Sequence, residues 1–231
     1  EIERTLLHMA KESQDSLQAE THLEKYILSQ FGRDVHPVIL EFAASQIRVQ
    51  QGMRDHFAAG LARALAYLPF MKEVFRQAGL PEELAYLPHI ESSFHPLARS
   101  KVGAAGMWQF MRSTARLYLK VNQLIDERYD PLIATQAAAR LLRYNYEQLG
   151  DWGLAITAYN FGLNGMKKAV AIHGPDYLKV RESFNHRKFK FASRNFYPEF
   201  LAVLEIMEDY QTYFPDVHPF ILPLTIRYQL K

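Results

Sequence analysis

Paired start and stop signals for helices recur along this sequence, and they limit the fold more than any other feature does. Asp130-Pro131 places a capping side chain before a proline, whose fixed φ angle and missing N–H suit the first position of a helix. Leucine and alanine then recur at helical spacing up to Gly150, a typical C-terminal cap. Asp151 can cap a second helix, which Gly162 closes. The pattern predicts consecutive helices joined by short turns.

The same signals extend to both sides of this region. Further helix starts are predicted at Pro81, Ser113, Asn164 and Pro198, and a break is predicted at 32–37. The helix starting at Pro198 is expected to bury the face formed by Phe200, Leu201, Leu204 and Met207. Two-residue alternation, which is typical of a strand, occurs only in the tail between residues 222 and 230. The predicted fold class is therefore all-α.

Composition agrees with one large folded domain, or one domain with an appendage. The 231 residues are 48% hydrophobic and 23% charged, and a chain of this length buries a sizeable core without disulfides. A net charge of +2 gives no general support for nucleic-acid binding. The lack of cysteine excludes zinc–thiolate sites and a thiol nucleophile. No apolar run has the length to span a bilayer, and the first residues do not resemble a signal peptide.

Three parts are predicted along the chain. Residues 1–60 carry no chemical motif and are expected to form an N-terminal helical extension packed on the core. Residues 61–175 contain the densest pattern of glycines, caps and polar side chains and are expected to form that core. Residues 176–231 become basic and aromatic and are expected to complete the domain with a helix and a tail.

Glu91 lies in sequence among the apolar residues Leu87, Ile90 and Phe94. Burial disfavours the ionised form of a carboxyl group, so its pKa rises and it can hold a proton near neutral pH. A general acid needs this property. On this segment alone, however, a glutamate on the solvent side of a helix is the better interpretation.

Two further segments combine glycines with residues that suit a sugar ligand. Gly103 and Gly106 allow a tight turn and a close approach of the backbone to a neighbour. Trp108 and Gln109 follow, offering an aromatic face and a combined donor and acceptor, although a turn before a core-facing helix explains them as well. The third segment, Ala-Tyr-Asn-Phe-Gly at 158–162, is also compatible with ordinary helix capping.

Taken in order, the motifs Glu-Ser, Gly-x-x-Gly-Met-Trp-Gln and Ala-Tyr-Asn-x-Gly resemble those of the family 1 lytic transglycosylases. Within that family, the chain most resembles the membrane-bound lytic transglycosylase D group. The resemblance is dense over 80–170 and looser over 191–204. Spacing agrees too, because Ser100 is nine residues and Gln109 eighteen residues after Glu91. The resemblance implies a lysozyme-like all-α fold with additional N- and C-terminal helices.

The resemblance also implies a role for each matching residue. Glu91 would be the only catalytic acid and base, Ser92 would help to hold the loop, and Ser100 would lie near the muramyl sugar. Gln109 would hydrogen-bond the substrate, and the Tyr159 hydroxyl would point toward Glu91. The positions expected to line the cleft are Gly106, Met107, Trp108, Gln109, Tyr159, Asn160 and Tyr197. The family's Glu-Thr pair before the last tyrosine is replaced here by Ser-Arg at 193–194.

The implied activity is cleavage of the bond between N-acetylmuramic acid and N-acetylglucosamine in peptidoglycan, with formation of 1,6-anhydromuramyl ends. The resemblance implies no metal and no organic cofactor. The implied partner is the glycan strand rather than nucleic acid, and the chain is expected to be a monomer. The substrate implies an extracytoplasmic location, in the periplasm or at the outer membrane. A membrane anchor or wall-binding repeats outside this chain are compatible with it.

Two other functions stay open at this point. A hydrolytic muramidase, acting on the same or an N-deacetylated glycan, would need a second carboxylate to activate water. Asp126, Glu127 and Glu147 are available for that role, whereas Asp130 and Asp151 are better explained as helix caps. The other alternative is a peptidoglycan-binding protein on an inactive fold.

The histidines and the basic stretch at 181–194 have simpler interpretations than metal or nucleic-acid binding. His89 and His95 are six residues apart and form no helical ligand pair. The stretch at 181–194 interleaves basic and aromatic residues. It is interpreted as a solvated face over an apolar seam, with a nucleic-acid surface and a basic rim that attracts muramyl-peptide carboxylates as alternatives.

Overall fold

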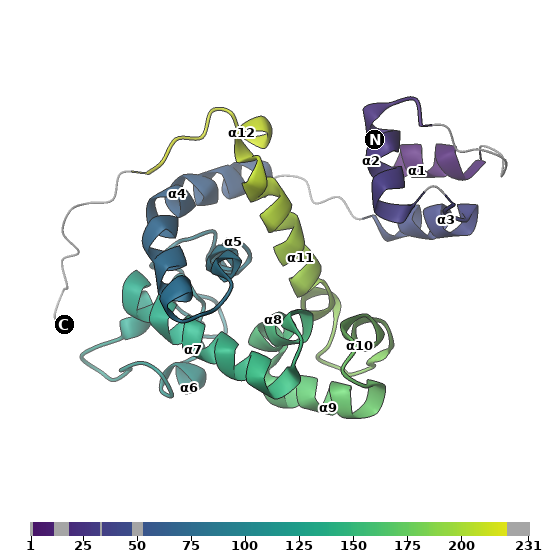
Figure 1. Cartoon of the computed structure of the whole chain (residues 1–231). Helices are drawn as coiled ribbons and strands as arrows, with labels where there is room; N and C mark the ends of the chain where they lie inside the picture. Colours follow the sequence, from purple (N-terminus) through teal and green to yellow (C-terminus); the bar gives the residue numbers. More distant parts are fainter. Residues whose placement is uncertain (1, 12–18, 33, 48–52, 221–231) are drawn as a thin grey trace. The chain divides into compact units, whose positions relative to one another are not determined.

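The structure, a computed structural model, describes residues 2–11, 19–32, 34–47 and 53–220. It divides into two compact units, Glu1–Gly52 and Met53–Lys231. Helices form the regular structure of the described residues, which contain isolated β-bridges but no strand, and the all-α prediction is confirmed for them (Figure 1). The alternation expected at 222–230 lies outside the described part of the chain. None of the helices described is both long and apolar enough to cross a bilayer.

The first unit is a small helical body with its own core. It contains α1 (Ile2–Lys11), α2 (His22–Phe31) and α3 (Pro37–Gln46), which confirms the predicted break at 32–37. A reciprocal capping box starts α2: Thr21 Oγ1 accepts from the Glu24 N–H at 3.2 Å, and Glu24 Oε2 accepts from the Thr21 N–H at 2.8 Å. The buried core of this unit consists of Leu6, Met9, Ile27, Leu28, Val35, Leu40 and Ala44.

The second unit contains all the later helices that the structure describes. They are α4 (Met53–Gln77), η1 (Glu82–Tyr86), α5 (Pro88–Ser92), α6 (Arg112–Ala115), η2 (Glu127–Tyr129), α7 (Pro131–Leu149), α8 (Trp152–Phe161), α9 (Leu163–His173), α10 (Tyr177–Ser183), α11 (Phe191–Glu208) and α12 (Tyr210–Tyr213). In Figure 1 the short α5 lies in the middle, with α4, α7, α8 and α11 around it. It packs against α4 and α11, while α8 packs against α7, α9 and α11.

The two central helices start and end where the sequence predicts. The Asp130 side chain accepts hydrogen bonds from two backbone N–H groups in the first turn of α7, both at 2.9 Å. Gly150 ends that helix with a left-handed φ of 73°. Asp151 then caps α8 by accepting from a backbone N–H at 2.8 Å, and Gly162 follows its last residue.

The start predicted at Pro198 is wrong, because this proline lies inside α11, which begins at Phe191. Proline has no N–H to donate to the carbonyl four residues earlier, which belongs to Arg194. That carbonyl instead accepts a hydrogen bond from Arg181 Nε at 3.1 Å. A side chain from α10 therefore replaces the missing helical hydrogen bond, and the helix continues through the proline.

Two further starts are displaced by one or two residues. The helix expected from Ser113 begins at Arg112, and the helix expected from Asn164 begins at Leu163. No side-chain cap starts either helix, so a sequence signal for capping does not locate their first residues. On the predicted face of the last helix, Leu201 is also misplaced, since it is 45% exposed.

The boundary predicted between residues 60 and 61 falls within α4, whereas the compact units divide between Gly52 and Met53. The helix continues through Gly60, which is buried and packs against Ser93 at the end of α5. The packing of the N-terminal extension on the core concerns how the two units are placed and stays a prediction.

Candidate active site

Glu91 lies on α5, in the middle of the second unit (Figure 1). Pro88 occupies the first position of this one-turn helix, where its missing N–H costs no hydrogen bond. The Glu91 side chain keeps partial access to solvent, yet desolvation of its carboxyl raises its pKa to about 8. No cation within the described residues offsets this effect. The carboxyl therefore stays protonated at neutral pH, whereas its segment alone favours a glutamate on the solvent side of a helix.

The chain leaves α5 through two consecutive residues with left-handed backbone conformation. The φ angles are 50° at Ser93 and 57° at Phe94, a region that residues other than glycine rarely adopt. The Ser93 N–H donates to the His89 carbonyl at 3.3 Å, and the Phe94 N–H donates to the Pro88 carbonyl at 3.1 Å. Phe94 is fully buried. Because such strain persists only where the surroundings enforce it, the contacts around residues 93–94 matter for the position of Glu91.

Helix α4 holds this turn at Ser93. The Ser93 hydroxyl is hydrogen-bonded to His56 Nδ1 at 2.8 Å, and Arg63 Nε donates to the Ser93 carbonyl at 3.0 Å. Between these two residues of α4 lies Gly60, where an added Cβ would come within 2.8 Å of Ser93 Cβ. The glycine lets α4 approach closely, and the two polar contacts hold the backbone two residues after Glu91.

The second motif is attached to α5 and to a buried arginine. The Ser92 hydroxyl donates to the Met107 carbonyl at 2.7 Å, which gives Ser92 the loop-holding contact expected of it. Gly106 has a φ of 78°, and a Cβ there would lie 1.7 Å from the Arg128 carbonyl oxygen, so only glycine fits. Arg128 is buried, donates to two carbonyls of the same loop at 3.0 Å each, and pairs with Asp126 at 2.7 Å.

The side chains of Met107 and Trp108 do not line a cleft, contrary to expectation. They are 1% and 0% exposed, respectively. The Trp108 indole N–H donates to the Thr135 hydroxyl of α7 at 2.9 Å, so both its apolar surface and its donor are used in the core. The sugar stacking expected of Trp108 does not fit this position. The backbone of these two residues is buried as well, and their carbonyls accept hydrogen bonds from Ser92 and Tyr159.

Gln109 and Ser100 keep partial solvent access but also make local hydrogen bonds. Gln109 adopts a φ of 46°, and its side-chain amide donates to the Gly106 carbonyl at 2.7 Å. The Ser100 hydroxyl accepts from the Ala104 N–H at 2.9 Å. Both side chains therefore stabilise the loop, and their contacts with a sugar stay predictions.

Tyr159, near the end of α8, lies within electrostatic reach of Glu91. Its hydroxyl donates to the Trp108 carbonyl at 2.7 Å. Burial, and then the charge of Glu91, raise the pKa of Tyr159 well above its usual value. Because the hydroxyl proton is committed to the Trp108 carbonyl, the oxygen can offer Glu91 only an acceptor. This arrangement favours the protonated form of Glu91.

The C-terminal segment joins the third motif through a contact that the sequence analysis did not predict. Ser193, from α11, donates to Asn160 Oδ1 at 2.8 Å. Tyr197, by contrast, lies against Gly153 in the first turn of α8, and its ring centroid is 4.9 Å from that of Tyr177. Asn160, which follows Tyr159, is therefore held by Ser193 near the C-terminal end of α8. Tyr197 lies at the other end of this helix.

The acids considered as a second carboxylate have structural partners. Burial alone would raise the pKa of Asp126, but hydrogen bonds and charge from Arg128 hold it below its ordinary value. Glu127 Oε2 accepts from the Lys120 N–H at 2.6 Å. Neither group has the enclosed, uncompensated setting of Glu91.

Glu199, on α11, is the acid that the sequence analysis missed, because no motif surrounds it. Burial raises the pKa of its carboxyl, a property often found at functional sites. Its side chain is nevertheless exposed, as is that of Glu147. Over the described ranges, no second carboxyl thus shares the enclosure of Glu91.

His89, on the same helix as Glu91, is a buried neutral residue. Its ring stacks on Phe57, with centroids 4.8 Å apart, and meets Phe94 edge-on at 4.7 Å. Burial, and then the charge of Arg63, lower the pKa of His89 to about 3. Groups of three or more side chains suited to a metal ion do not occur in the part of the chain that the structure describes.

An enclosed carboxyl that holds its proton at neutral pH has the property that a general acid needs. Residues 70–176 belong to the family described as Transglycosylase SLT domain, and this range contains all three motifs. The family prediction is confirmed, and the helical architecture agrees with the lysozyme-like fold that it implied.

Three curated relatives overlap this region. The chain is 33% identical over 129 residues to the membrane-bound lytic murein transglycosylase D of Escherichia coli (strain K12), which covers 54% of this chain and 27% of the relative. The protein of that name from Escherichia coli O6:H1 matches equally. A transglycosylase of Enterobacteria phage PRD1 is 38% identical over 74 residues, or 32% of this chain and 26% of the relative. The chain spans about a quarter of the length of these relatives.

Proposed function

We propose that this chain is a peptidoglycan lytic transglycosylase that cleaves the β-1,4 bond between N-acetylmuramic acid and N-acetylglucosamine. The observation that carries the proposal is the Glu91 carboxyl, with a pKa of about 8 and no second carboxyl enclosed with it among the described residues. The SLT domain and the names of the relatives support the same substrate.

In the proposed reaction, Glu91 acts first as an acid and then as a base. It gives its proton to the bridging oxygen, and N-acetylglucosamine leaves with a free C4 hydroxyl. The acetamido group of the muramyl sugar stabilises the positive charge that develops at C1. The Glu91 carboxylate then takes the proton of the C6 hydroxyl of that sugar, whose oxygen bonds to C1. The product is a 1,6-anhydromuramyl end, and Glu91 is protonated again.

The loop that ends at Gln109 and the end of α8 form the rest of the proposed site. Ser92 and Gly106 hold the loop, and we assign Ser100, Gln109 and Asn160 to substrate contacts. Met107 and Trp108 are buried and support the loop through their carbonyls, which accept from Ser92 and Tyr159, and Tyr159 supports the protonated acid. Tyr197 packs against the first turn of α8, so we assign it no direct contact with the substrate, only an effect through the position of this helix. The substrate places the proposed activity outside the cytoplasm.

Hydrolysis by water at the same bond is the alternative product chemistry, and no observation favours it. It needs a carboxylate that positions water. Asp126 is paired with Arg128, and Glu127 is bonded to the backbone of Lys120. Neither is free to act as a base without breaking contacts that stabilise the loop.

Digestion of purified sacculi followed by mass spectrometry of the products tests the proposal. We expect anhydromuramyl ends from the unaltered protein, and at least a roughly thousandfold loss of rate in Glu91→Gln, because that variant has no proton to donate. Glu147→Gln, at an exposed position of α7, is the matched control and should keep full activity. Products with reducing muramyl ends would show that the protein is a hydrolase and not a transglycosylase. An active Glu91→Gln protein would show that Glu91 is not the catalytic acid.

A further inference from the structure

The stretches of the second unit that contain no acidic residue include 92–125, 152–175 and 183–198. Together these three hold eleven of the 27 Lys and Arg residues and none of the 25 Asp and Glu residues. Every candidate site residue except Glu91 lies within one of them. The segments that surround the catalytic acid are therefore basic, although the net charge of the whole chain is only +2.

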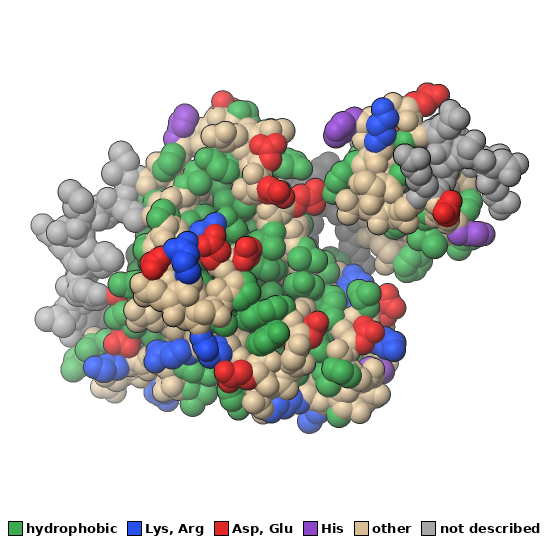
Figure 2. Space-filling model, in the orientation of Figure 1, with side chains coloured by type: hydrophobic (Ala, Val, Ile, Leu, Met, Phe, Trp, Pro, Cys, Tyr) green, Lys and Arg blue, Asp and Glu red, His purple; other side chains and the backbone are tan. Residues whose placement is uncertain are grey.

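Some cations elsewhere in this unit lie beside acids. Arg76 pairs with Glu73 and with Glu82, and Figure 2 shows acidic and basic side chains intermingled near the centre of the larger unit. Lys179 similarly lies 4.0 Å from Asp176. Such neighbours cancel charge locally, whereas no acid within 92–125, 152–175 or 183–198 does so for the cations there.

The loop between α10 and α11 is anchored beside the third motif. Phe184 and Phe189 are buried, and their ring centroids lie 6.1 and 5.0 Å from that of Phe161, the residue that follows Asn160. The Ser193 hydrogen bond to Asn160 fixes the start of α11 at the same place. The loop therefore has a defined position next to the site. Its three exposed cations are Arg187, Lys188 and Lys190.

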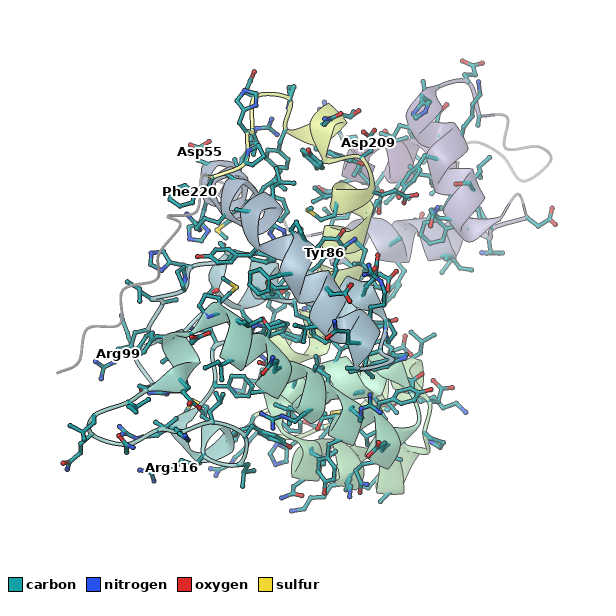
Figure 3. The ribbon with its side chains drawn as sticks, turned by 60° about the vertical axis from the view of Figure 1, so that its left-hand side comes forward. Asp55, Tyr86, Arg99, Arg116, Asp209 and Phe220 are labelled. Atoms are coloured by element: carbon teal, nitrogen blue, oxygen red, sulfur yellow. The ribbon has the colours of Figure 1, made fainter. Side chains whose placement is uncertain are left out.

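Two more exposed cations, Arg99 and Lys101, lie on either side of Ser100 in the sequence, between Glu91 and the second motif. The Ser100 N–H donates to the Ala104 carbonyl at 2.9 Å, and its hydroxyl accepts from the Ala104 N–H at the same distance. A tight turn therefore holds both cations, and Figure 3 shows Arg99 at the outer edge of this segment.

These five side chains have no ion pair and no side-chain hydrogen bond within the described ranges, whereas the other arginines of the basic stretches are hydrogen-bonded to backbone carbonyls. Arg112 and Arg116 donate to backbone carbonyls at 3.2 and 3.4 Å, and Arg194 donates to the Phe184 carbonyl at 2.7 Å. Those three stabilise loops. The five exposed side chains stay available to an anionic ligand.

We propose that Arg99, Lys101, Arg187, Lys188 and Lys190 form a basic rim that binds the carboxylates of the peptides attached to the muramyl sugars. This inference rests on the proposed function and specifies its substrate as the anionic, peptide-bearing strand. The stretches that carry these cations contain no acid of their own that would repel such a strand. Because the cations are exposed, the attraction weakens as salt rises.

The test compares two forms of one substrate. Soluble peptidoglycan strands are used either unchanged or after their peptide carboxylates have been converted to neutral methylamides, so that sugar and peptide length stay the same. We expect kcat/KM of the unaltered protein to be about tenfold higher on the anionic strands at low salt, and this preference to shrink at high salt.

Charge-matched variants then assign the preference to residues. The rim variant replaces all five cations with glutamine, and we expect it to lose about tenfold in kcat/KM on anionic strands and to change less than about twofold on neutral ones. The control variant removes five exposed cations elsewhere and should behave as the unaltered protein. Its substitutions are Arg4→Gln, Lys11→Gln, Lys25→Gln, Arg143→Gln and Lys179→Gln.

The outcomes separate this inference from the proposed function. If the unaltered protein cleaves both strands and the rim variant matches it on both, or declines equally on both, the basic rim is overturned while the proposed function stands. If the unaltered protein cleaves neither strand, the proposed function fails. Calorimetric titration of the Glu91→Gln protein with the soluble anionic and neutral strands then decides the rim separately: equal binding overturns it, and stronger binding to anionic strands supports it.

Discussion

The Glu91 carboxyl is desolvated, and no charge among the described residues compensates it, which keeps its proton in place near neutral pH. The same setting works against folding at alkaline pH. Below the ordinary pKa of 4.5, the carboxyl is protonated in both the folded and the unfolded chain, so burial costs no ionisation energy. As pH rises toward about 8, the unfolded chain releases the proton and the folded chain retains it, so folding becomes less favourable.

Glu91→Gln should therefore stabilise the protein in a pH-dependent way. Glutamine is neutral at all pH values and lacks the ionisation cost. We expect the free energy of unfolding to gain about 1–3 kcal/mol at alkaline pH and close to nothing in mild acid, and urea titrations at both pH values measure this difference. Equal effects at the two pH values would show that the carboxyl of the folded protein is not desolvated.

Ser93 combines backbone strain with contacts to α4, and substitutions can separate the two. Ser93→Gly relieves the left-handed φ of 50° but removes the hydroxyl bonded to His56, whereas Ser93→Ala removes the hydroxyl and keeps the strain. We expect Ser93→Gly to be about 1 kcal/mol more stable than Ser93→Ala and both to lose about tenfold in rate, because each releases the turn after Glu91.

Melting curves and rates on sacculi measure these two effects. A Ser93→Gly protein with full activity would show that the His56 contact has no influence on Glu91. A Ser93→Ala protein as stable as Ser93→Gly would show that the turn is not strained.

At the scale of single residues, the sequence predicts Glu91 as the acid but misses the orientation of Trp108. The choice of Glu91 follows from the three motifs in order, although its segment alone favours a solvent-side glutamate. The orientation of Trp108 does not, because the hydroxyl that binds its indole belongs to Thr135, which lies 27 residues away on α7. An aromatic residue in a glycine-rich motif suits a sugar and a core equally well, and only the tertiary structure distinguishes the two.

At the scale of elements, the sequence predicts what nearby residues determine and misses what a distant residue determines. The ends of α7 and α8 are determined by Asp130, Gly150 and Asp151, whose side chains or conformations act within one turn, and the sequence predicts them correctly. The continuation of α11 through Pro198 depends on Arg181 from another helix, so a rule about proline alone fails there.

The approach of α4 to α5 depends on one glycine and leads to a further prediction. Alanine at position 60 would favour the isolated helix by about 1 kcal/mol, but its Cβ would meet Ser93 Cβ at 2.8 Å. Since this is a contact with another helix, α4 must move. We expect Gly60→Ala to lower the free energy of unfolding by about 1–3 kcal/mol and to reduce activity, as chemical denaturation and sacculus digestion will show.

The adjacent exposed position of α4 supplies the control for this effect. Ala59→Gly changes helix propensity alone, so it should cost about 1 kcal/mol and leave activity unaltered. If Gly60→Ala were as stable and as active as the unaltered protein, the close approach of the two helices would have no part in positioning Glu91.

At the scale of the whole molecule, the chain has separate cores in its two units. The core of Glu1–Gly52 consists of residues from its own three helices, and the large core of the second unit begins at Leu61 on α4. A boundary at residue 60, predicted from the start of the motif-bearing region, would cut α4 after its first two turns. Those turns carry His56, Phe57 and Gly60, which contact Ser93 and His89.

Two fragments that differ by eight residues test where the catalytic unit begins. We expect residues 53–231 to unfold cooperatively and to keep wall-degrading activity, because they retain all of α4. Residues 61–231 should melt at a lower temperature and lose most activity, because the His56 and Phe57 contacts to α5 are missing. Calorimetry and sacculus digestion of both fragments measure this difference, and equal behaviour would place the boundary at residue 61 after all. If residues 53–231 melt several degrees below the same transition in the full chain, the first unit stabilises the second, as an extension packed on the core would.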